Sequence, residues 1–546
     1  MSKMSKAVDT MKEVSELRLD ETVTNFMGGD SYKINPLDTL KMIAASSIMG
    51  EPSYYRDSKS SKKYCVNSLV SDFVVTPDWF DNKTTDEIFT KAIDKALVYD
   101  FLGTLHLAVE LRDTYNMRLN PQVIMVRAAV HPYRKKFTSE NPGVFGALNQ
   151  KVMRRADEPL TQITYYLYIN GGKKNNIPSI LKRSWANRIS ALTPYEIAKY
   201  RNHEVGMIDG VRISHATSEV IDELMSTGKV EVTVDNMTWE NLRSAGKPWK
   251  EILQTIRVPH MALLRNLRGI FTEIEDIEFC KEVLEQLKGG VLKGKQFPFR
   301  YWSALQAIKG STCNHKPLLT DALEECMDIA LANMPKLEGK TMCLSDNSGS
   351  AWGSFNSEYG TVTVANIDNL SSVMTACNSD EGYVGKFGDR LKVYPINHRN
   401  GVLSQANDVN SSRGSDVGGA TEGGIWLFFR DAIKKKEHWD NIFIYSDMQA
   451  GHGGLYGTAE HRRQYEKEGF CCNYSHINVF KLIQDYRKKV NPKVNVFCIQ
   501  TAGYDNVLIP EYAYRTNIMY GWTGKESLFA SEMIKQWDEL DTKNKV

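Results

Sequence analysis

Five side chains in the C-terminal part of the sequence could hold a divalent cation, and three of them lie in one short motif. In Asp346-Asn347-Ser348-Gly349-Ser350 the alternate residues can turn their oxygens to one side of the loop that follows the apolar run KTMCLSD. One carboxylate and two hydroxyls are hard oxygen ligands, which suit Mg²⁺, Mn²⁺ or Ca²⁺ rather than Zn²⁺. By itself the motif is weak evidence, because many such stretches are only turns at the end of a strand.

Two further oxygen-bearing side chains, those of Thr421 and Asp447, occur at positions that would bring them to the same edge of a sheet as this motif. Thr421 lies in the glycine-rich segment GGATEGG just before the helical stretch GIWLFFRDAI, and Asp447 ends the apolar run IYSD. With all five groups in this order, the segment resembles the von Willebrand A and integrin inserted domains. The resemblance implies a metal-ion-dependent adhesion site in which these five residues hold a divalent cation, first of all Mg²⁺. Such a site leaves one coordination position open for water or for an acidic group of a partner.

We predict that this site is not catalytic. Hydrolysis with two metal ions needs more carboxylates, and a metal-activated water needs an acid or a base close by. His452, in AGHGGLYG soon after Asp447, is interpreted as a residue of a surface turn rather than as a base. The chain is therefore not expected to be an enzyme.

The elements that must position these groups are short strands that alternate with helices from residue 338 to 546. KTMCLSD, NIFIYSD and KVNVFCIQ are mainly apolar runs, and they alternate with helical patterns such as GGIWLFFRDAIKKK and SHINVFKLIQDYRKKV. This alternation predicts a Rossmann-like α/β domain with a mostly parallel sheet, whose ligand site lies at the carboxyl ends of the strands. The segment 378–418 is rich in Asn, Ser, Gly and Asp, and it is expected to form hairpins and loops near that edge.

Residues 31–337 carry helical patterns, with apolar residues at steps of three and four. Examples are TTDEIFTKAIDKALVYDFLGTLHLAVELRDT (84–114), MALLRNLRGIFT (261–272) and IEFCKEVLEQLK (277–288). Helix pairs joined by short loops favour a HEAT-like solenoid, because each pair needs a neighbour to bury its apolar face. An irregular helical bundle is the alternative. Residues 1–30 are polar and are expected to form a loosely ordered arm.

The net charge of +2 is distributed unevenly along the chain. Residues 127–215 contain 15 Lys and Arg against 6 Asp and Glu, so this segment is basic. Basic side chains neutralise nucleic-acid phosphates, and aromatic rings offer stacking surfaces to unpaired bases. Tyr133, Trp185, Tyr195 and Tyr200 are interleaved with the basic residues. The segment therefore suggests an RNA-binding surface, with a solvated helical face as the alternative.

The two parts of the chain together resemble the Ro autoantigen family, whose helical part is the TROVE module. The motifs that carry the resemblance are VPHMALLRNLRGI (258–270), FPFRYWSALQAIKG (297–310), YEIAKYRNHEVGMIDGVRISH (195–215), which is similar to the family's KYKxR…LxxLSH region, and the tail RTNIMYGW (515–522). The resemblance implies a ring of HEAT-like helix pairs whose ends are joined by the metal-binding domain. It also implies that small noncoding Y RNAs dock on the basic outer surface, and that single-stranded 3′ ends of misfolded RNAs enter a central hole.

The resemblance also assigns individual residues. Lys199, Arg201 and His215 fall on positions that in the family touch Y RNA, and His203 stands where a family member has Arg. Arg265 and Arg268 could face the hole, although Arg265 could instead brace a loop by hydrogen bonds to carbonyls. The RNA-binding residues that we predict are Lys199, Arg201, His203, His215, Arg134, Lys135, Lys136, Arg154, Arg155, Lys182, Arg183, Arg188, Arg265 and Arg268.

Composition places limits on the compartment. Nine cysteines without a CxxC pair fit reduced thiols better than disulfides or a zinc site. No stretch approaches the ~20 apolar residues that a membrane span needs, and the start of the sequence lacks the apolar core of a signal peptide. We expect a monomer in the cytoplasm.

These observations predict a non-catalytic RNA-binding scaffold in RNA quality control. A nuclease or another protein could bind through the metal site. One alternative is a cation-dependent, adhesion-type protein-binding module, in which the helices are a scaffold and no RNA is bound. A metal-dependent hydrolase is a third possibility, which turnover abolished by Asp346→Ala would support.

Overall fold

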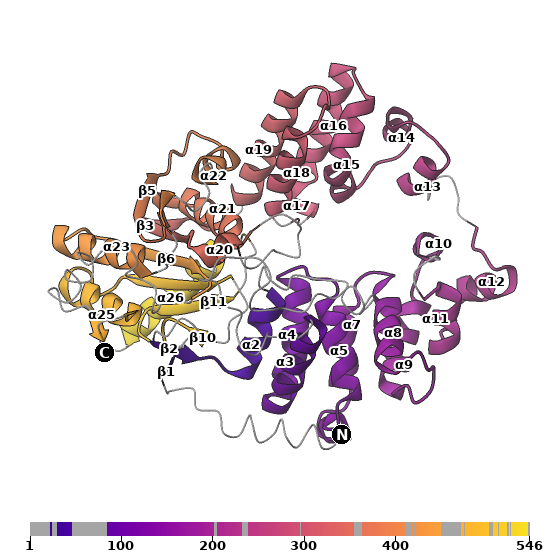
Figure 1. Ribbon diagram of the computed structural model, residues 1–546. Helices are drawn as coiled ribbons and strands as arrows, with labels where there is room; N and C mark the ends of the chain where they lie inside the picture. Colours follow the sequence, from indigo (N-terminus) through magenta and orange to yellow (C-terminus); the bar gives the residue numbers. More distant parts are fainter. Residues whose placement is uncertain are drawn as a thin grey trace.

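The computed structural model of the chain describes residues 22–24, 30–45, 85–200, 205–231, 238–294, 296, 298–332, 334–353, 363–410, 416–418, 422–448, 471–473, 476–501, 506–510, 513–520, 524 and 526–543. A helical part precedes an α/β domain in this structure, as the sequence predicts (Figure 1). In the described part of the chain, no helix combines the length and apolarity that crossing a membrane requires.

The α/β domain is built on a six-stranded sheet with the strand order β11-β9-β6-β3-β4-β5. The first five strands in this order run parallel, and β5 pairs antiparallel with β4 at the edge. The strands are β3 (Leu337–Asp346), β4 (Ser379–Phe387), β5 (Leu391–Pro395), β6 (Asn441–Ser446), β9 (Asn495–Gln500) and β11 (Thr516–Tyr520). The predicted mostly parallel sheet and the late strand in RTNIMYGW are both confirmed.

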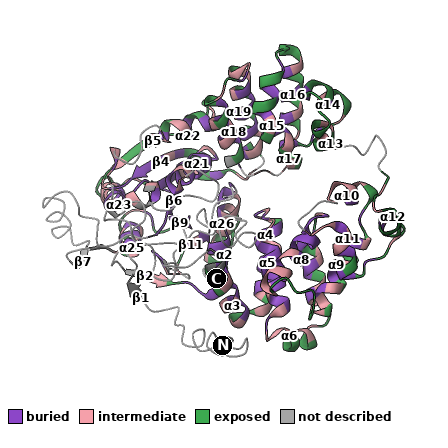
Figure 2. Cartoon of the chain, turned by 45° about the vertical axis from the view of Figure 1, so that its right-hand side comes forward, coloured by how far each residue is buried: buried purple, intermediate pink, exposed green. Residues whose placement is uncertain are grey.

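Helices cover both faces of this sheet, because alternate residues of the central strands point to opposite sides. Phe443 and Tyr445 of β6 pack with α21 (Val364–Cys377) and α22 (Val402–Asn410), whereas Ile442 and Ile444 pack with α23 (Glu422–Lys435) and α25 (Val479–Lys489). In Figure 2 the central strands are buried, whereas β5 at the edge is mostly exposed. The remaining elements described here are α20 (Gly349–Gly353), α23 (Glu422–Lys435), α25 (Val479–Lys489), α26 (Glu526–Lys543), β7 (Cys471–Asn473) and β8 (His476–Ile477).

The segment 378–418 differs from the expectation of hairpins and loops alone. Its β4–β5 hairpin is present, but β4 is an inner strand of the sheet beside β3, and α22 follows it. The sequence of β4 hides this role, because Lys386 is fully buried and paired with Asp416. Gly382 is also required, since a Cβ there would lie 2.0 Å from the carbonyl oxygen of Ala376.

The helices before the sheet form two groups, each with its own hydrophobic core. The first helical group packs around Trp185 and Tyr165, and the second around Phe271 and Tyr301. The first group comprises α2 (Pro36–Ala45), α3 (Thr85–Tyr99), α4 (Phe101–Asp113), α5 (Asn120–Val130), α6 (Arg134–Glu140), α7 (Val144–Val152), α8 (Glu158–Ile169), α9 (Ser179–Ser190), α10 (Pro194–Lys199), α11 (Met207–Ser214) and α12 (Glu219–Thr227). The second comprises α13 (Trp239–Ser244), α14 (Trp249–Thr255), α15 (His260–Glu273), α16 (Ile277–Gly289), α17 (Val291–Gly294), α18 (Phe299–Lys309) and α19 (Lys316–Ala332).

These two cores differ from the single continuous core that a solenoid predicts. Within the described residues, the core of the first group extends to Leu224 of α12, and that of the second begins at Trp249 of α14. Each core instead includes residues of the α/β domain, such as Tyr520 in the first and Phe443 in the second. The α/β domain therefore packs against both helical groups.

Strands from the two ends of the chain pair with each other, so the start of the helical part is joined to the α/β domain that follows its end. β2 (Asp30–Lys33) pairs antiparallel with β1 (Thr22–Thr24) and with β10 (Asn506–Val507) of the α/β domain. The Tyr115 hydroxyl also lies 3.5 Å from the carbonyl oxygen of Tyr520, to which it donates a hydrogen bond. In Figure 1 the chain accordingly passes from α2 through both helical groups to the sheet and returns to the neighbourhood of α2. Residues 22–24 and 30, inside the predicted polar arm, are thus strand residues.

Candidate functional site

The carboxyl ends of β3 and β6 bring two of the predicted metal ligands together. Asp346 is the last residue of β3, and Asp447 follows directly after β6, the strand beside it. The helices that follow these two strands pack on opposite faces of the sheet, α21 after β3 on one face and α25 after β6 on the other. A crevice between such strands is the usual ligand site of an open α/β sheet.

Asp346 is held rigidly at this edge. Its Oδ1 accepts a hydrogen bond of 2.8 Å from the backbone N–H of Ser348, and its Oδ2 accepts one of 2.6 Å from the Ser446 hydroxyl. The Ser446 hydroxyl also accepts from the N–H of Met448, whose φ of 62° lies in the left-handed region. The turn after β6 is therefore fixed to the same carboxylate as the turn after β3.

The electrostatics of this edge favour a cation. Asp346 and Asp447 are 0% and 1% exposed. Burial, and then the neighbouring charge of Asp447, raise the pKa of Asp346 to about 7. No ion pair joins Asp346 to a basic side chain of the described part of the chain. A divalent cation would neutralise both carboxylates, so the donor set fits the implied metal.

An amide network supports the loop between these ligands. The backbone N–H of Asn347 donates to the carbonyl of Phe387, and its side chain exchanges hydrogen bonds of 2.8 and 3.0 Å with Asn369 of α21. Asn369 Oδ1 also accepts from the Ser345 hydroxyl at 2.7 Å. This network orients the loop, so Ser348, which is 1% exposed, lies at the same edge.

The five predicted ligands are thus only partly placed by the structure. Ser350 belongs to α20, without a described side chain, and Thr421 lies outside the described residues, as does His452. In the described ranges, no three His, Cys, Asp or Glu side chains converge closely enough to hold an ion by themselves. A cation here would therefore depend on hydroxyl and water oxygens in addition to carboxylates, as the predicted set of two aspartates, two serines and one threonine requires.

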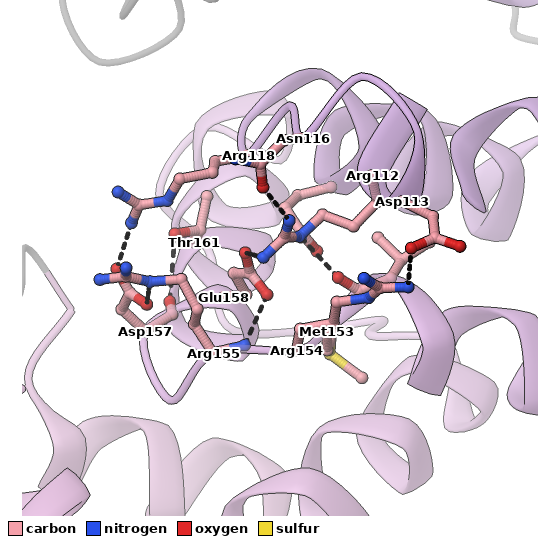
Figure 3. A network of polar contacts seen from close by, with 12 residues as sticks. Arg112, Asp113, Asn116, Arg118, Met153, Arg154, Arg155, Asp157, Glu158 and Thr161 are labelled. Atoms are coloured by element: carbon pink, nitrogen blue, oxygen red, sulfur yellow. Dashed lines mark hydrogen bonds and ion pairs between the residues drawn. The ribbon is translucent and has the colours of Figure 1, made fainter. Parts of the chain in front are cut away.

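Some of the predicted RNA-binding residues of the first helical group pair with carboxylates of the chain, and others have exposed side chains; Arg154 is paired although it is exposed. Figure 3 shows the paired ones, in a network that surrounds the start of α8. Arg155 contacts Asp157 and donates to the Tyr200 hydroxyl, while Arg154 binds Asp113 at 2.8 Å. These predicted RNA contacts therefore already have protein partners, which hold the loop between α7 and α8.

Arg188 has a similar structural role. Its guanidinium donates to the carbonyls of Met153 and Arg154 and pairs with Glu196 at 3.3 Å. It therefore connects α9 to the loop before α8. Arg134 at the start of α6 and Lys182 in α9 are half-buried.

Other predicted residues have side chains exposed to solvent. Lys135, Lys136, Arg183 and His215 are exposed, and His215 caps the C-terminus of α11. Lys199 is half-buried, with its ammonium 5.7 Å from the ring centre of Tyr195 and 5.8 Å from that of Tyr200. Arg201 and His203 lie outside the described residues.

Trp185 corrects the expectation that it offers a stacking surface to bases. It is 0% exposed and donates its indole N–H to Gln162 at 2.9 Å, so it is a core residue. Tyr133, Tyr195 and Tyr200 are half-buried.

Helix α15 carries the most specific helical motif and separates its residues by face. Arg265 and Arg268 are both exposed, and no hydrogen bond of the Arg265 guanidinium to a carbonyl is recorded among the described residues. His260 at the start of the helix is buried, with Nδ1 2.9 Å from the Leu287 carbonyl and Nε2 3.0 Å from the Tyr301 hydroxyl. Helix α15 therefore has one face packed in the hydrophobic core and one basic face exposed to solvent.

Asp368 and Asn369 of α21 lie beside the carboxyl end of β3, and the sequence analysis did not predict them as part of this site. Both are 0% exposed. The signal that could have found them is the group of polar residues in IDNLSS, within a helix whose remaining positions are mostly apolar. Polar groups buried against a sheet need a partner, and these lie beside Asp346 and Asn347.

Comparisons with known proteins bear on the fold. No protein-family model matches the sequence, and no curated protein matches it significantly. The chain is similar in structure to the Ro (RSR) protein of Deinococcus radiodurans, with a TM-score of 0.52 and 13% sequence identity over 92% of this chain and 100% of that one. The predicted resemblance to the Ro family is therefore confirmed in the fold, across nearly the whole chain.

Proposed function

We propose that this chain is an RNA-binding protein of the Ro type, a non-catalytic scaffold for small RNAs. The observation that carries the proposal is the shared fold with a Ro protein over 92% of the chain. A likeness of this extent includes both helical groups and the α/β domain, so it supports a common architecture rather than one common module.

The exposed basic residues of the first helical group support an outer RNA surface. Lys135 and Lys136 on α6, Arg183 on α9 and His215 after α11 face solvent. Lysine and arginine in such positions neutralise phosphates and release counterions. We propose that Y-like small noncoding RNAs dock here, with Lys199 stacked near Tyr195 as part of the same surface.

A second RNA site would lie in the space enclosed by the two helical groups and the α/β domain. The closure through β2 and β10 brings the ends of the helical part to one domain, as a ring requires. Arg265 and Arg268, exposed on α15, would contact the single-stranded 3′ ends of misfolded RNAs in the central hole.

The α/β domain would hold Mg²⁺ through Asp346, Ser348, Ser350, Thr421 and Asp447. The buried aspartates at the ends of β3 and β6 support this assignment. The bound ion would supply an open coordination position, through which a nuclease or another protein partner could attach. We propose a cytoplasmic role of the monomer in RNA quality control.

The test is RNA binding by the full chain over a range of salt concentrations, measured by fluorescence anisotropy with a labelled structured RNA. Affinity should fall steeply with added salt and persist in EDTA. Lys135→Glu with Lys136→Glu should weaken binding about ten-fold, as expected for a few lost phosphate contacts. The matched control is Lys481→Glu with Lys488→Glu, two exposed lysines on α25 of the α/β domain, which should bind like the wild type. Equal affinities of both double variants would exclude this surface.

The second candidate function is a cation-dependent protein-binding module without RNA. The buried pair of aspartates at the sheet edge favours it, because such a pair suits an adhesion-type metal site. Binding of a protein partner that EDTA abolishes, together with no salt-dependent RNA binding, would support this alternative.

A further inference from the structure

Helix α21 buries a carboxylate that no well-formed hydrogen bond satisfies in the described part of the chain. Asp368 is 0% exposed, and neither of its oxygens has a hydrogen-bond partner of normal geometry in the described part of the chain. One turn further along, the Ser372 hydroxyl is also buried and without a partner there. Buried polar atoms of this kind normally bind ordered water or an ion.

This carboxylate lies beside the candidate cation site. The next residue, Asn369, binds Ser345 and Asn347 on either side of Asp346, which fixes this turn of α21 against the carboxyl end of β3. Burial, followed by the charge of Asp346, raises the pKa of Asp368 well above its ordinary value; Asp447 adds to this, and the neighbouring Thr501 hydroxyl opposes it. Three aspartates from three different segments therefore share one buried region.

Charge balance at this edge calls for a cation. A buried carboxylate without a partner is costly, and neighbouring like charges increase the cost. No ion pair with a basic side chain is recorded for Asp346 or Asp368 in the described ranges. A divalent cation near Asp346 and Asp447 would relieve the repulsion among all three aspartates.

We propose that Asp368 is a positioning residue of the cation site, which accepts hydrogen bonds from water molecules bound to the ion. The role is through water, because no three acidic, histidine or cysteine side chains of the described residues converge on one point. Ser372 would bind the same water cluster from the next turn. This inference rests on the proposed cation site and adds a residue from α21 to the five predicted ligands.

The charge of Asp368 also affects which kind of group could occupy the open coordination position of the ion. Two aspartates neutralise a divalent cation, so a third leaves the loaded site negative. The open coordination position then favours water or a neutral donor over an acidic group of a partner. An adhesion-type site, which takes an acidic ligand, would gain nothing from Asp368.

The test is Mn²⁺ titration of the full chain by calorimetry after treatment with EDTA, together with melting temperatures with and without Mn²⁺. Asp368→Asn keeps the shape of the side chain and removes its charge. It should weaken Mn²⁺ binding about ten-fold or more, as loss of groups around the metal ligands does. Because repulsion is relieved, it should also raise the melting temperature without metal. The matched control is Asp157→Asn, an equally conservative change at a buried aspartate that has arginine partners. It should leave Mn²⁺ affinity unchanged and lower the melting temperature.

Each of the following results would overturn the proposal. Wild-type Mn²⁺ affinity in Asp368→Asn would show that the carboxylate does not support the ion. A lower melting temperature without metal, at unchanged affinity, would show a structural role only. If Asp368→Asn does not fold, Asp368→Ser takes its place and should show the same loss of Mn²⁺ affinity. Unchanged Mn²⁺ affinity in Asp368→Ser would overturn the proposal. A wild-type chain that binds no Mn²⁺ would overturn the proposed cation site as well, so the two failures are distinguishable.

Discussion

Two regions of this molecule bury carboxylates, and they do so under opposite conditions. In the first helical group, Asp157 is 7% exposed and binds Arg118 at 2.7 Å and Arg155 at 3.0 Å. Burial alone would raise the pKa of Asp157, but these two arginines outweigh it and the pKa lies below its ordinary value. At the carboxyl end of β3, burial and Asp447 raise the pKa of Asp346 to about 7.

The difference separates buried acids that pair with arginines of the chain from buried acids that lie beside one another. Around α8 the chain supplies its own cations, so the charges there hold helices and loops together (Figure 3). At the sheet edge the aspartates lie close to one another and to hydroxyls. An external divalent cation would do for this edge what the arginines do around α8.

The largest expected effect on stability comes from removing an arginine that pairs with a buried carboxylate near α8. Arg112 and Glu158 pair at 3.0 Å with side chains 6% and 2% exposed. Arg112→Met should destabilise the first helical group by about 3–5 kcal/mol, because it leaves a buried carboxylate without its partner. Urea denaturation followed by circular dichroism measures this. Lys174→Met, which breaks an exposed pair with Asp209, should cost less than about 1 kcal/mol. Equal losses in the two variants would contradict the distinction.

The next effect concerns the proposed cation at the sheet edge. Mn²⁺ at about 100 times its dissociation constant should stabilise the wild-type chain by about 2.7 kcal/mol, because only the folded state holds the site. Asp346→Ala should abolish this stabilisation and leave RNA affinity nearly unchanged. Thermal melts with and without Mn²⁺, and anisotropy on the same samples, check both points. RNA binding lost together with the metal would mean that the two sites are not separate.

A smaller effect concerns the predicted RNA contacts at the end of α10 and in the residues that follow it. Lys199→Glu combined with Arg201→Glu should weaken RNA binding about ten-fold at moderate salt, which corresponds to about 1.4 kcal/mol. The slope of affinity against salt should also become shallower. Lys481→Glu with Lys488→Glu, which changes the net charge equally, is the control for a general charge effect. If the control loses as much affinity, the Lys199 surface has no specific role.

The smallest effect is a pH dependence of the paired carboxylate. Since the folded-state pKa of Asp157 is depressed, the native chain binds fewer protons there than the unfolded chain. Its contribution to stability is present above the unfolded pKa of about 4 and is lost as the pH falls through the folded value. Asp157→Asn should therefore flatten the loss of stability below pH 4, as measured by urea midpoints from pH 6 to pH 3. An unchanged acid slope would show that Arg118 and Arg155 do not favour the charged form.

Much of this arrangement follows from local sequence. The apolar runs that end in Asp346 and Asp447 are strands β3 and β6, and parallel strands bring their carboxyl ends to one edge. Apolar residues at steps of three and four gave most helices of both helical groups. The long pattern 84–114 proved to be two helices, since Asp100 caps α4 by accepting from the Gly103 N–H. These features depend on near neighbours in the chain, which a sequence pattern contains.

Only the tertiary structure decided which charges are matched. The polar residues of α21 are visible in the sequence, but only the sheet that covers them shows that Asp368 is buried. Nothing around Arg155 separates an RNA contact from a partner of Asp157. The closure of β2 on β10 likewise joins segments more than 470 residues apart. The physical reason is that the energy of a buried charge depends on what the folded chain places within a few ångströms, and such neighbours come from distant segments without a common period.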